Sequence, residues 1–126
     1  MAFEVIRRTD TPASHLPFSP AIRAGDFVFV SGQASVDTSG KIVSDTFEGE
    51  FRRSLDNVKK VLEAAGLDLS NVVQVRSYLA HEKDLAEYNQ LYREHFTEPY
   101  PARTTIVGVL GTALKFEIDV TAYAGK

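Results

Sequence analysis

Between positions 47 and 65 the apolar side chains recur at steps of three and four residues, which is the repeat of one face of an α-helix. These residues are Phe47, Phe51, Leu55, Val58, Leu62 and Ala65. Charged residues fill the opposite side, and Gly66 follows at a position where helices commonly end. A helix that is apolar on one side has to pack against a second apolar layer, which the rest of the chain must supply.

That second layer is predicted to be a β-sheet. The run from Phe27 to Gln33 is β-branched and aromatic, and both of its alternating sets are apolar, which is typical of an interior strand. Further strands are predicted over residues 3–8, 72–79, 104–110 and 115–123, with an additional short candidate near 41–44. Three prolines between residues 9 and 20 exclude a helix or a central strand there and predict a loop.

A second helix is predicted over residues 84–96. Its apolar positions at helical spacing are Leu85, Tyr88, Tyr92 and Phe96. The resulting order, β-β-α-β-α-β-β in a single domain spanning 1–126, predicts an α+β fold, an α/β sandwich with one mixed β-sheet and two helices on one face. If the last two strands, which only a short turn separates, form a hairpin, they are neighbours in that sheet.

The predicted sheet has a face that the two helices leave uncovered. The strands that start at Phe27 and Thr104 are nevertheless apolar on both faces. Because a large exposed apolar patch is rarely tolerated on a monomer, we expect a second copy of the chain to cover this face. The expected assembly is a homo-oligomer in which sheets face each other.

Composition excludes several classes of function. The chain carries 14 Lys plus Arg against 17 Asp plus Glu, and a net charge of −3 lacks the broad positive field that generic nucleic-acid binding needs. No cysteine is present, so disulfides, thiolate metal sites and cysteine nucleophiles are excluded. No segment approaches the roughly 20 apolar residues of a membrane span, and residues 1–8 lack a signal peptide's apolar core, so we expect a cytoplasmic protein. His15, His81 and His95 lie in three unrelated segments, and no metal site is expected.

Two charged residues on or beside predicted strands are candidates for chemistry. Arg103 stands at the start of one strand, and Glu117 lies within another strand whose opposite face is apolar. Residue type alone favours a solvated salt bridge on a sheet face, because most Arg and Glu side chains are exposed. In a hairpin the two would be separated along the strands unless the strands were offset, so the sequence leaves their distance open.

A family resemblance favours a functional role for Arg103 and Glu117 over a surface salt bridge. Its most specific pieces are Ser31-Gly32-Gln33, Asn57 with Ala64-Ala65-Gly66, Asn89, Pro101-Ala102-Arg103 and Glu117-Ile118. With the segments around them, from about residue 17 to the end, they resemble the Rid/YjgF family of RidA-like reactive intermediate deaminases. The resemblance implies a chorismate-mutase-like fold and a homotrimer whose sheets pack into a central β-barrel, with three clefts between subunits.

The resemblance also implies an activity, hydrolysis at a C=N bond. Its substrates would be 2-imino acids and their enamine tautomers, such as 2-aminoacrylate, which pyridoxal-phosphate enzymes release and which become 2-keto acids and ammonia. By the same resemblance, Arg103 would hold the substrate carboxylate bidentately. Glu117, with its pKa raised by partial burial, would activate the water and return a proton to the leaving nitrogen. No cofactor is required, because the electron-sink chemistry belongs to the upstream enzyme.

Four further residues are candidates for substrate binding. The Gly32 amide and the Thr105 hydroxyl would contact the substrate or its water, although a cysteine is common in the family where Thr105 stands. Phe18 supplies an aromatic wall where many members have a tyrosine, and packing within the proline-rich loop explains it equally well. Asn89 is better explained by bonds to its own helix and a neighbouring loop than by substrate contact.

Two other functions stay open. A non-catalytic trimer could use the same clefts to bind a small carboxylate, such as a keto acid, or a partner protein, and the departures at Phe18 and Thr105 favour this reading. Ribonuclease activity or translation inhibition is attributed to some relatives. The net charge of −3 and the absence of paired histidines or a metal site argue against it.

Overall fold

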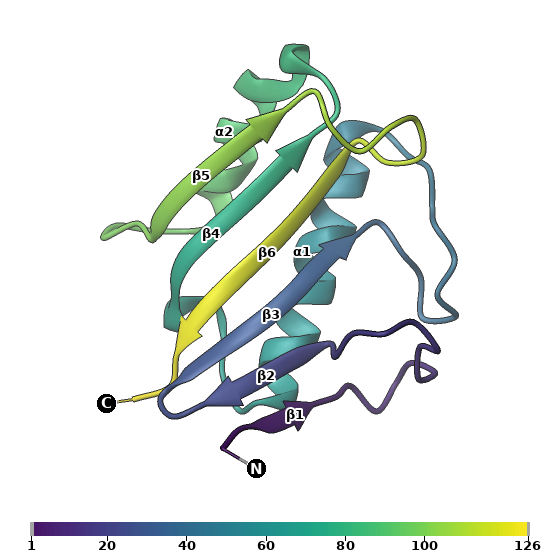
Figure 1. Ribbon diagram of the computed structural model, residues 1–126. Coiled ribbons are helices and arrows are strands. Elements are labelled where there is room, and N and C mark those ends of the chain that lie inside the picture. Colours follow the sequence, from purple (N-terminus) through teal and green to yellow (C-terminus); the bar gives the residue numbers. More distant parts are fainter. Residues whose placement is uncertain (1, 126) are drawn as a thin grey trace.

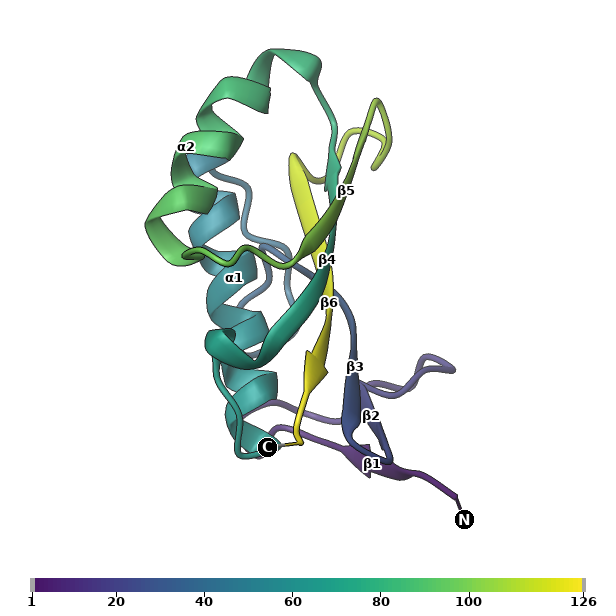
Figure 2. The same cartoon turned by 90° about the vertical axis from the view of Figure 1, so that its left-hand side faces the viewer.

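The computed structural model describes residues 2–125 and shows one β-sheet packed against two helices (Figure 1). The strands are β1 (Glu4–Ile6), β2 (Ala21–Ala24), β3 (Phe27–Ala34), β4 (Val72–Leu79), β5 (Ala102–Val107) and β6 (Phe116–Tyr123). The α-helices are α1 (Phe47–Ala64) and α2 (Leu85–His95), and the short 3-10 helices are η1 (Leu69–Asn71) and η2 (Glu82–Asp84). Both α-helices lie on the same side of the sheet (Figure 2), as the sequence predicts.

The six strands form a single mixed sheet in the order β1-β2-β3-β6-β4-β5. Strands β4 and β5 are parallel, and every other neighbouring pair is antiparallel. The mixed sheet that the alternation of strands and helices predicts is therefore confirmed. Strand β3 is an interior strand, as its two apolar sets indicate.

The last two strands do not form a hairpin, an arrangement that the sequence left open. Strand β6 lies between β3 and β4, and β5 lies outside β4 at the edge of the sheet. The connection between them passes the end of β4, where the Gly108 amide donates to the Leu79 carbonyl at 2.9 Å and the Ala80 amide to the Lys115 carbonyl at 3.1 Å. Gly108 has a φ of 84°, a left-handed conformation that suits glycine and lets the chain turn away from β5.

The amino-terminal part of the sheet differs from the prediction in two places. Strand β2 was not expected, because its four residues stand between Pro20 and a glycine turn and include only one β-branched side chain. It forms because β3 gives it a full set of partners, with Ile22 opposite Phe29. The short candidate near 41–44 makes only an isolated bridge between Val36 and Ile42.

The hydrophobic core lies between the helices and the sheet. Its largest members come from α1, α2, β4 and β6 and include Phe51, Leu55, Tyr88, Leu79 and Phe116. Glu50 is also fully buried, and its carboxylate accepts from the Asp45 amide at 3.2 Å, the Lys115 amide at 2.9 Å and the Lys115 Nζ at 3.2 Å. This carboxylate ties the start of α1 to the start of β6.

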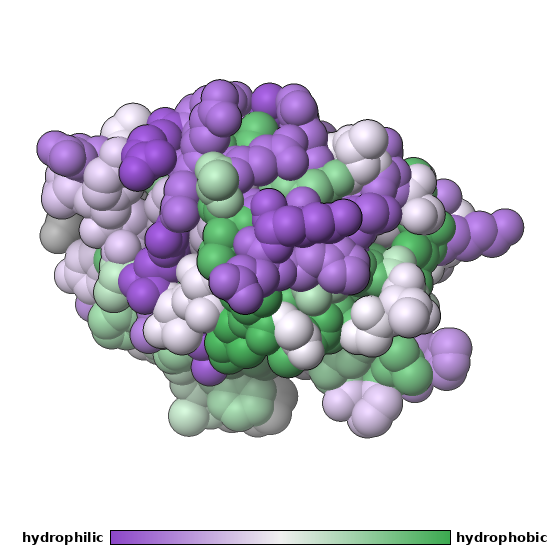
Figure 3. Space-filling model, turned by 90° about the horizontal axis from the view of Figure 1, so that it is seen from above, coloured by the Kyte–Doolittle hydropathy of each residue, from purple (hydrophilic) through white to green (hydrophobic). Residues whose placement is uncertain are grey.

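The other face of the sheet carries exposed apolar side chains. Phe27, Phe29 and Ile106 are 41%, 48% and 41% exposed, and Val73 and Tyr123 are also open to solvent. Seen from above, the hydrophobic surface gathers along the side of the molecule that this face occupies (Figure 3). The helices leave this face uncovered, as the sequence predicts.

Candidate active site

Arg103 lies on the helix side of edge strand β5, near its start. Its guanidinium carbon is 5.0 Å from the ring centroid of Tyr88 and 4.8 Å from that of Tyr92, both on α2. A cation within about 6 Å of an aromatic centroid is attracted by the ring quadrupole, so the two rings hold the side chain in place. The Arg103 side chain is exposed to solvent, but it lies against these two rings and does not extend away from the protein.

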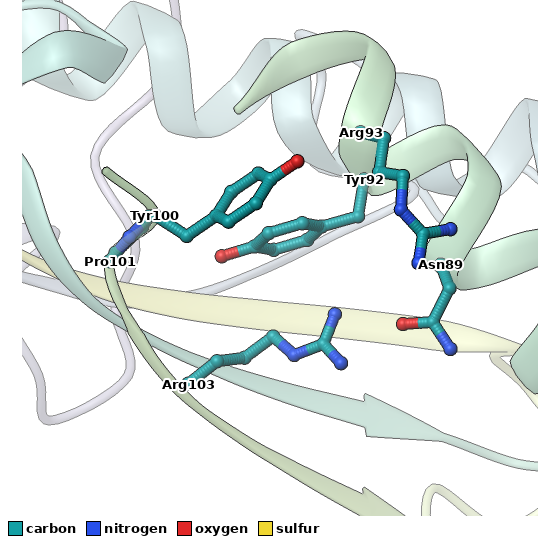
Figure 4. Close-up of a pocket in the computed structure, with 6 residues that line it drawn as sticks. All are labelled: Asn89, Tyr92, Arg93, Tyr100, Pro101 and Arg103. Carbon is teal, nitrogen blue, oxygen red and sulfur yellow. The ribbon is translucent and has the colours of Figure 1, made fainter. Parts of the chain in front are cut away.

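The Arg103 guanidinium faces a hollow of about 280 Å³ between α2 and β5 (Figure 4). The hollow is lined by Asn89, Tyr92, Arg93, Tyr100, Pro101 and Arg103. Within residues 2–125, the Arg103 side chain forms no hydrogen bond and no ion pair. Its planar set of donors is therefore available to a carboxylate from outside the protomer.

Thr105 lies two residues after Arg103 and points to the same face of the sheet. Its backbone pairs with Ser77 of β4, and the Ser77 hydroxyl accepts from Tyr88 at 2.6 Å. The buried hydroxyls of Thr105 and Tyr92 have no hydrogen-bond partner within the part of the chain that the structure describes. Burial, the largest cause, raises the pKa of Tyr92 to about 12, so its phenol is a neutral donor near neutral pH.

Glu117 and Gly32 come together at an irregularity of strand β3. Val30 pairs with Val120 and Gln33 with Ile118, so Ser31 and Gly32 stand opposite the single residue Asp119. A Cβ atom at position 32 would overlap the Glu117 carboxylate, so any larger residue there would force this side chain to move. Strand β6 supplies the carboxylate, and the missing side chain of β3 makes room for it.

The Glu117 carboxylate has no hydrogen bond or ion pair with any residue from 2 to 125. Burial raises its pKa, and the nearby charge of Asp119 raises it further. Asp119 itself accepts from Arg76 at 2.9 Å and from Tyr78 at 2.8 Å. Glu117 is thus the carboxylate on this strand that accepts no hydrogen bond from residues 2–125.

Phe18 lies in the proline-rich loop above the irregular part of β3. It is 54% exposed and lines, together with Gly32, a hollow of about 320 Å³. Ser31 holds this loop, since its amide donates to Pro20 at 2.9 Å and its hydroxyl to Ser19 at 2.6 Å. Phe18 therefore borders the same hollow as Gly32.

The six predicted site residues fall into two groups that do not meet within one protomer. Arg103 shares a cross-strand row with Val75 and Val120, which are buried under the helices. Glu117 shares a row with Tyr78, three positions further along β4 than Val75. Because successive side chains point to opposite faces, Arg103 lies on the helix face and Glu117 on the open face. Asn89 and Thr105 belong with Arg103, and Gly32 and Phe18 with Glu117.

Comparison with known proteins identifies the family. Residues 8–124 match the family described as Endoribonuclease L-PSP. A RutC family protein of Pyrococcus horikoshii is 39% identical over 95% of this chain and 97% of its own length. The human 2-iminobutanoate/2-iminopropanoate deaminase is 32% identical over 96% of this chain and 90% of its own. The crystal structure of RidA from an Antarctic Psychrobacter superposes with a TM-score of 0.85 at 30% identity, covering 95% of this chain and 98% of that one.

The chain belongs to the Rid/YjgF/L-PSP (RutC) family. Asn57, one of the residues that carries the resemblance, has a structural role in this Rid protein. Its amide nitrogen donates at 3.0 Å to the carbonyls of Ala34 and Val36, and its oxygen accepts from Arg8 at 2.9 Å. It joins α1 to the end of β3 and to the amino-terminal loop.

The sequence does not indicate several of the residues around Arg103. The helical spacing of Tyr88 and Tyr92 predicts core positions, although both rings also support the guanidinium. The spacing of four places both rings on one helix face but does not show which strand lies beneath them. Arg93 and Tyr100 gave no signal in the sequence, because each has the pattern of an ordinary exposed residue.

The predicted bonding of Asn89 to its surroundings has no counterpart in the described part of this Rid protein. Its side chain forms no hydrogen bond with residues 2–125 and instead borders the hollow.

No group of three or more potential metal ligands occurs among residues 2–125. Within the same range, no helix has the length and apolar character needed to cross a membrane.

Proposed function

We propose that this Rid protein hydrolyses 2-imino acids and their enamine tautomers to 2-keto acids and ammonia. The observation that carries the proposal is the Arg103 guanidinium, supported by two tyrosine rings at the border of a hollow and free of protein partners within residues 2–125. A guanidinium in this setting suits a small carboxylate. Relatives named imine deaminases, from human and mouse, are similar to nearly the whole chain.

The complete site would be shared between protomers of a homotrimer. The two groups of site residues lie on opposite faces of one sheet, so no motion of side chains alone can join them in a single chain. The exposed apolar face offers a surface for self-association. A head-to-tail contact that sets the β5 edge of one copy against the irregular part of β3 of the next would unite the groups, and such contacts close into rings.

Arg103 would orient the substrate in this cleft. Its two parallel N–H donors would grip the carboxylate, so that the adjacent C=N carbon is held at a fixed distance from the neighbouring protomer. The Thr105 hydroxyl, which lacks a partner within the described residues, would donate to the substrate or its water. The Gly32 backbone, which has no side chain in the way, would border the reacting atoms.

Glu117 would act as the general acid and base. Its raised pKa makes the carboxylate a stronger base than an ordinary glutamate. It would accept a proton from water as the water oxygen bonds to the imine carbon. The same proton then passes to the nitrogen of the tetrahedral adduct. Glu117 then takes the proton of the adduct's hydroxyl group and returns it to the nitrogen, so that the C–N bond breaks as the C=O bond forms and ammonia leaves. An imine already hydrolyses in water, so positioning and one acid/base group, worth on the order of 10² to 10⁴ in rate, are a sufficient contribution.

The proposal is tested with imines made in place by an amino-acid oxidase. We expect the purified protein to accelerate keto acid and ammonia release, and Arg103→Ala to lower this acceleration roughly 100-fold. Arg52→Ala, which removes an exposed arginine from α1, is the matched control and should leave the rate unchanged. Keto acid binding that depends on Arg103 but comes without turnover would instead support a binding protein. RNA cleavage that survives purification and disappears with one site substitution would support a ribonuclease.

A further inference from the structure

The hollow beside Arg103 contains a second guanidinium. Arg93 lies on α2 one turn after Asn89, and both residues line the hollow with Arg103. In Figure 4 the Arg93 side chain extends from the helix and the Arg103 side chain from the strand, and both approach the Asn89 amide. Two cations from different elements therefore converge on one small space.

Nothing within the described protomer neutralises this pair. Four other arginines bond carboxylates: Arg8, Arg52, Arg53 and Arg76. Arg93 and Arg103 form neither ion pairs nor hydrogen bonds with residues 2–125. Like charges that face one hollow repel each other, and the repulsion is relieved when an anion enters.

We propose that Arg93 binds a second carboxylate of the substrate, so that the protein selects 2-imino dicarboxylic acids. The inference rests on the proposed function, in which Arg103 holds the carboxylate next to the C=N bond. Arg93 then receives the carboxylate at the far end of the side chain, and the Asn89 amide can donate to either group. The hollow of about 280 Å³ has the volume of roughly nine water molecules, which is enough for a diacid of four or five carbons.

The nature of the walls supports a charged rather than an aliphatic side chain. Three of the six lining residues present N–H donors, namely Asn89, Arg93 and Arg103. An alkyl group placed here would remove water from these donors without replacing its hydrogen bonds. A carboxylate would accept from them, and a charge-assisted pair of this kind strengthens binding roughly 10- to 100-fold.

A matched pair of keto acids, used as product probes, tests the inference. 2-Oxoglutarate and 2-oxopentanoate have the same five-carbon chain and differ only in a terminal carboxylate or methyl group. By calorimetry we expect 2-oxoglutarate to bind the intact protein roughly 10- to 100-fold more tightly. In Arg93→Gln the ratio of the two affinities should fall to about one. Lys83→Gln, which removes the same charge from exposed η2, should leave both affinities unchanged.

Turnover gives an independent measurement. Imines of glutamate and norvaline, made by an oxidase, should show the same preference in kcat/KM, and Arg93→Gln should remove it. If 2-oxopentanoate binds in an Arg103-dependent way while 2-oxoglutarate binds no more tightly, the dicarboxylate inference is wrong and the carboxylate anchor stands. If neither keto acid binds and neither imine is hydrolysed, the proposed function fails and the inference fails with it.

Discussion

Glu50 and Glu117 are both removed from bulk water, but their surroundings differ. Glu50 is fully buried and accepts three hydrogen bonds, from the Asp45 amide and from the amide and Nζ of Lys115. Glu117 is partly buried and accepts none from residues 2–125. A carboxylate whose acceptor positions are filled holds two segments together. A carboxylate whose acceptor positions are empty can instead accept a hydrogen bond or a proton from a substrate or water.

The largest effect should come from removing the charge of Glu117. Glu117→Gln keeps the shape of the side chain but abolishes its ability to accept a proton, so kcat/KM for imine hydrolysis should fall roughly 10²- to 10⁴-fold. Circular dichroism should remain that of the unchanged protein, and the unfolding midpoint should not fall, because no bond within the described protomer is lost. Full activity in this variant would show that Glu117 is not the acid/base group.

The opposite pattern is expected for Glu50. Glu50→Ala leaves buried donors of Asp45 and Lys115 without an acceptor and opens a cavity, so the free energy of unfolding should fall by about 3 kcal/mol. Urea denaturation measures this change. Glu48→Ala removes an exposed carboxylate two residues away, whose partner is Arg52, and should cost less than about 1 kcal/mol. Equal losses in the two variants would contradict the role assigned to Glu50.

Local patterns predicted the elements of this fold better than their arrangement. The steps of three and four in α1 and the two apolar sets of β3 are set by neighbouring residues, so the sequence shows them directly. The insertion of β6 between β3 and β4 is not local, because it depends on which strands bury the most apolar surface together. A hairpin between β5 and β6 satisfies the local pattern equally well, so that pattern leaves the pairing of these two strands open.

The same distinction separates the predicted from the missed parts of the site. Arg103 and Glu117 could be named from the family resemblance, but a shift of one residue in strand register would reverse the face of either side chain. Only the pairing of β4 with both neighbours shows that they point to opposite faces. Arg93 has the sequence pattern of a solvated helix residue, and its meaning depends on the strand that faces it.

The smallest effect, a change of stability with pH, tests the difference between the carboxylates most directly. Burial raises the pKa of Glu117 above its ordinary value, so as pH rises the unfolded chain loses this proton before the folded protein does. The folded protein therefore loses stability over that interval, whereas Glu117→Gln does not. Thermal midpoints of the two proteins should agree below about pH 4, and at neutral pH the variant should be the more stable. A protein that instead gained stability relative to the variant as pH rose would have a partner that lowers the pKa of Glu117, and the carboxylate would then resemble Glu50 in holding structure together.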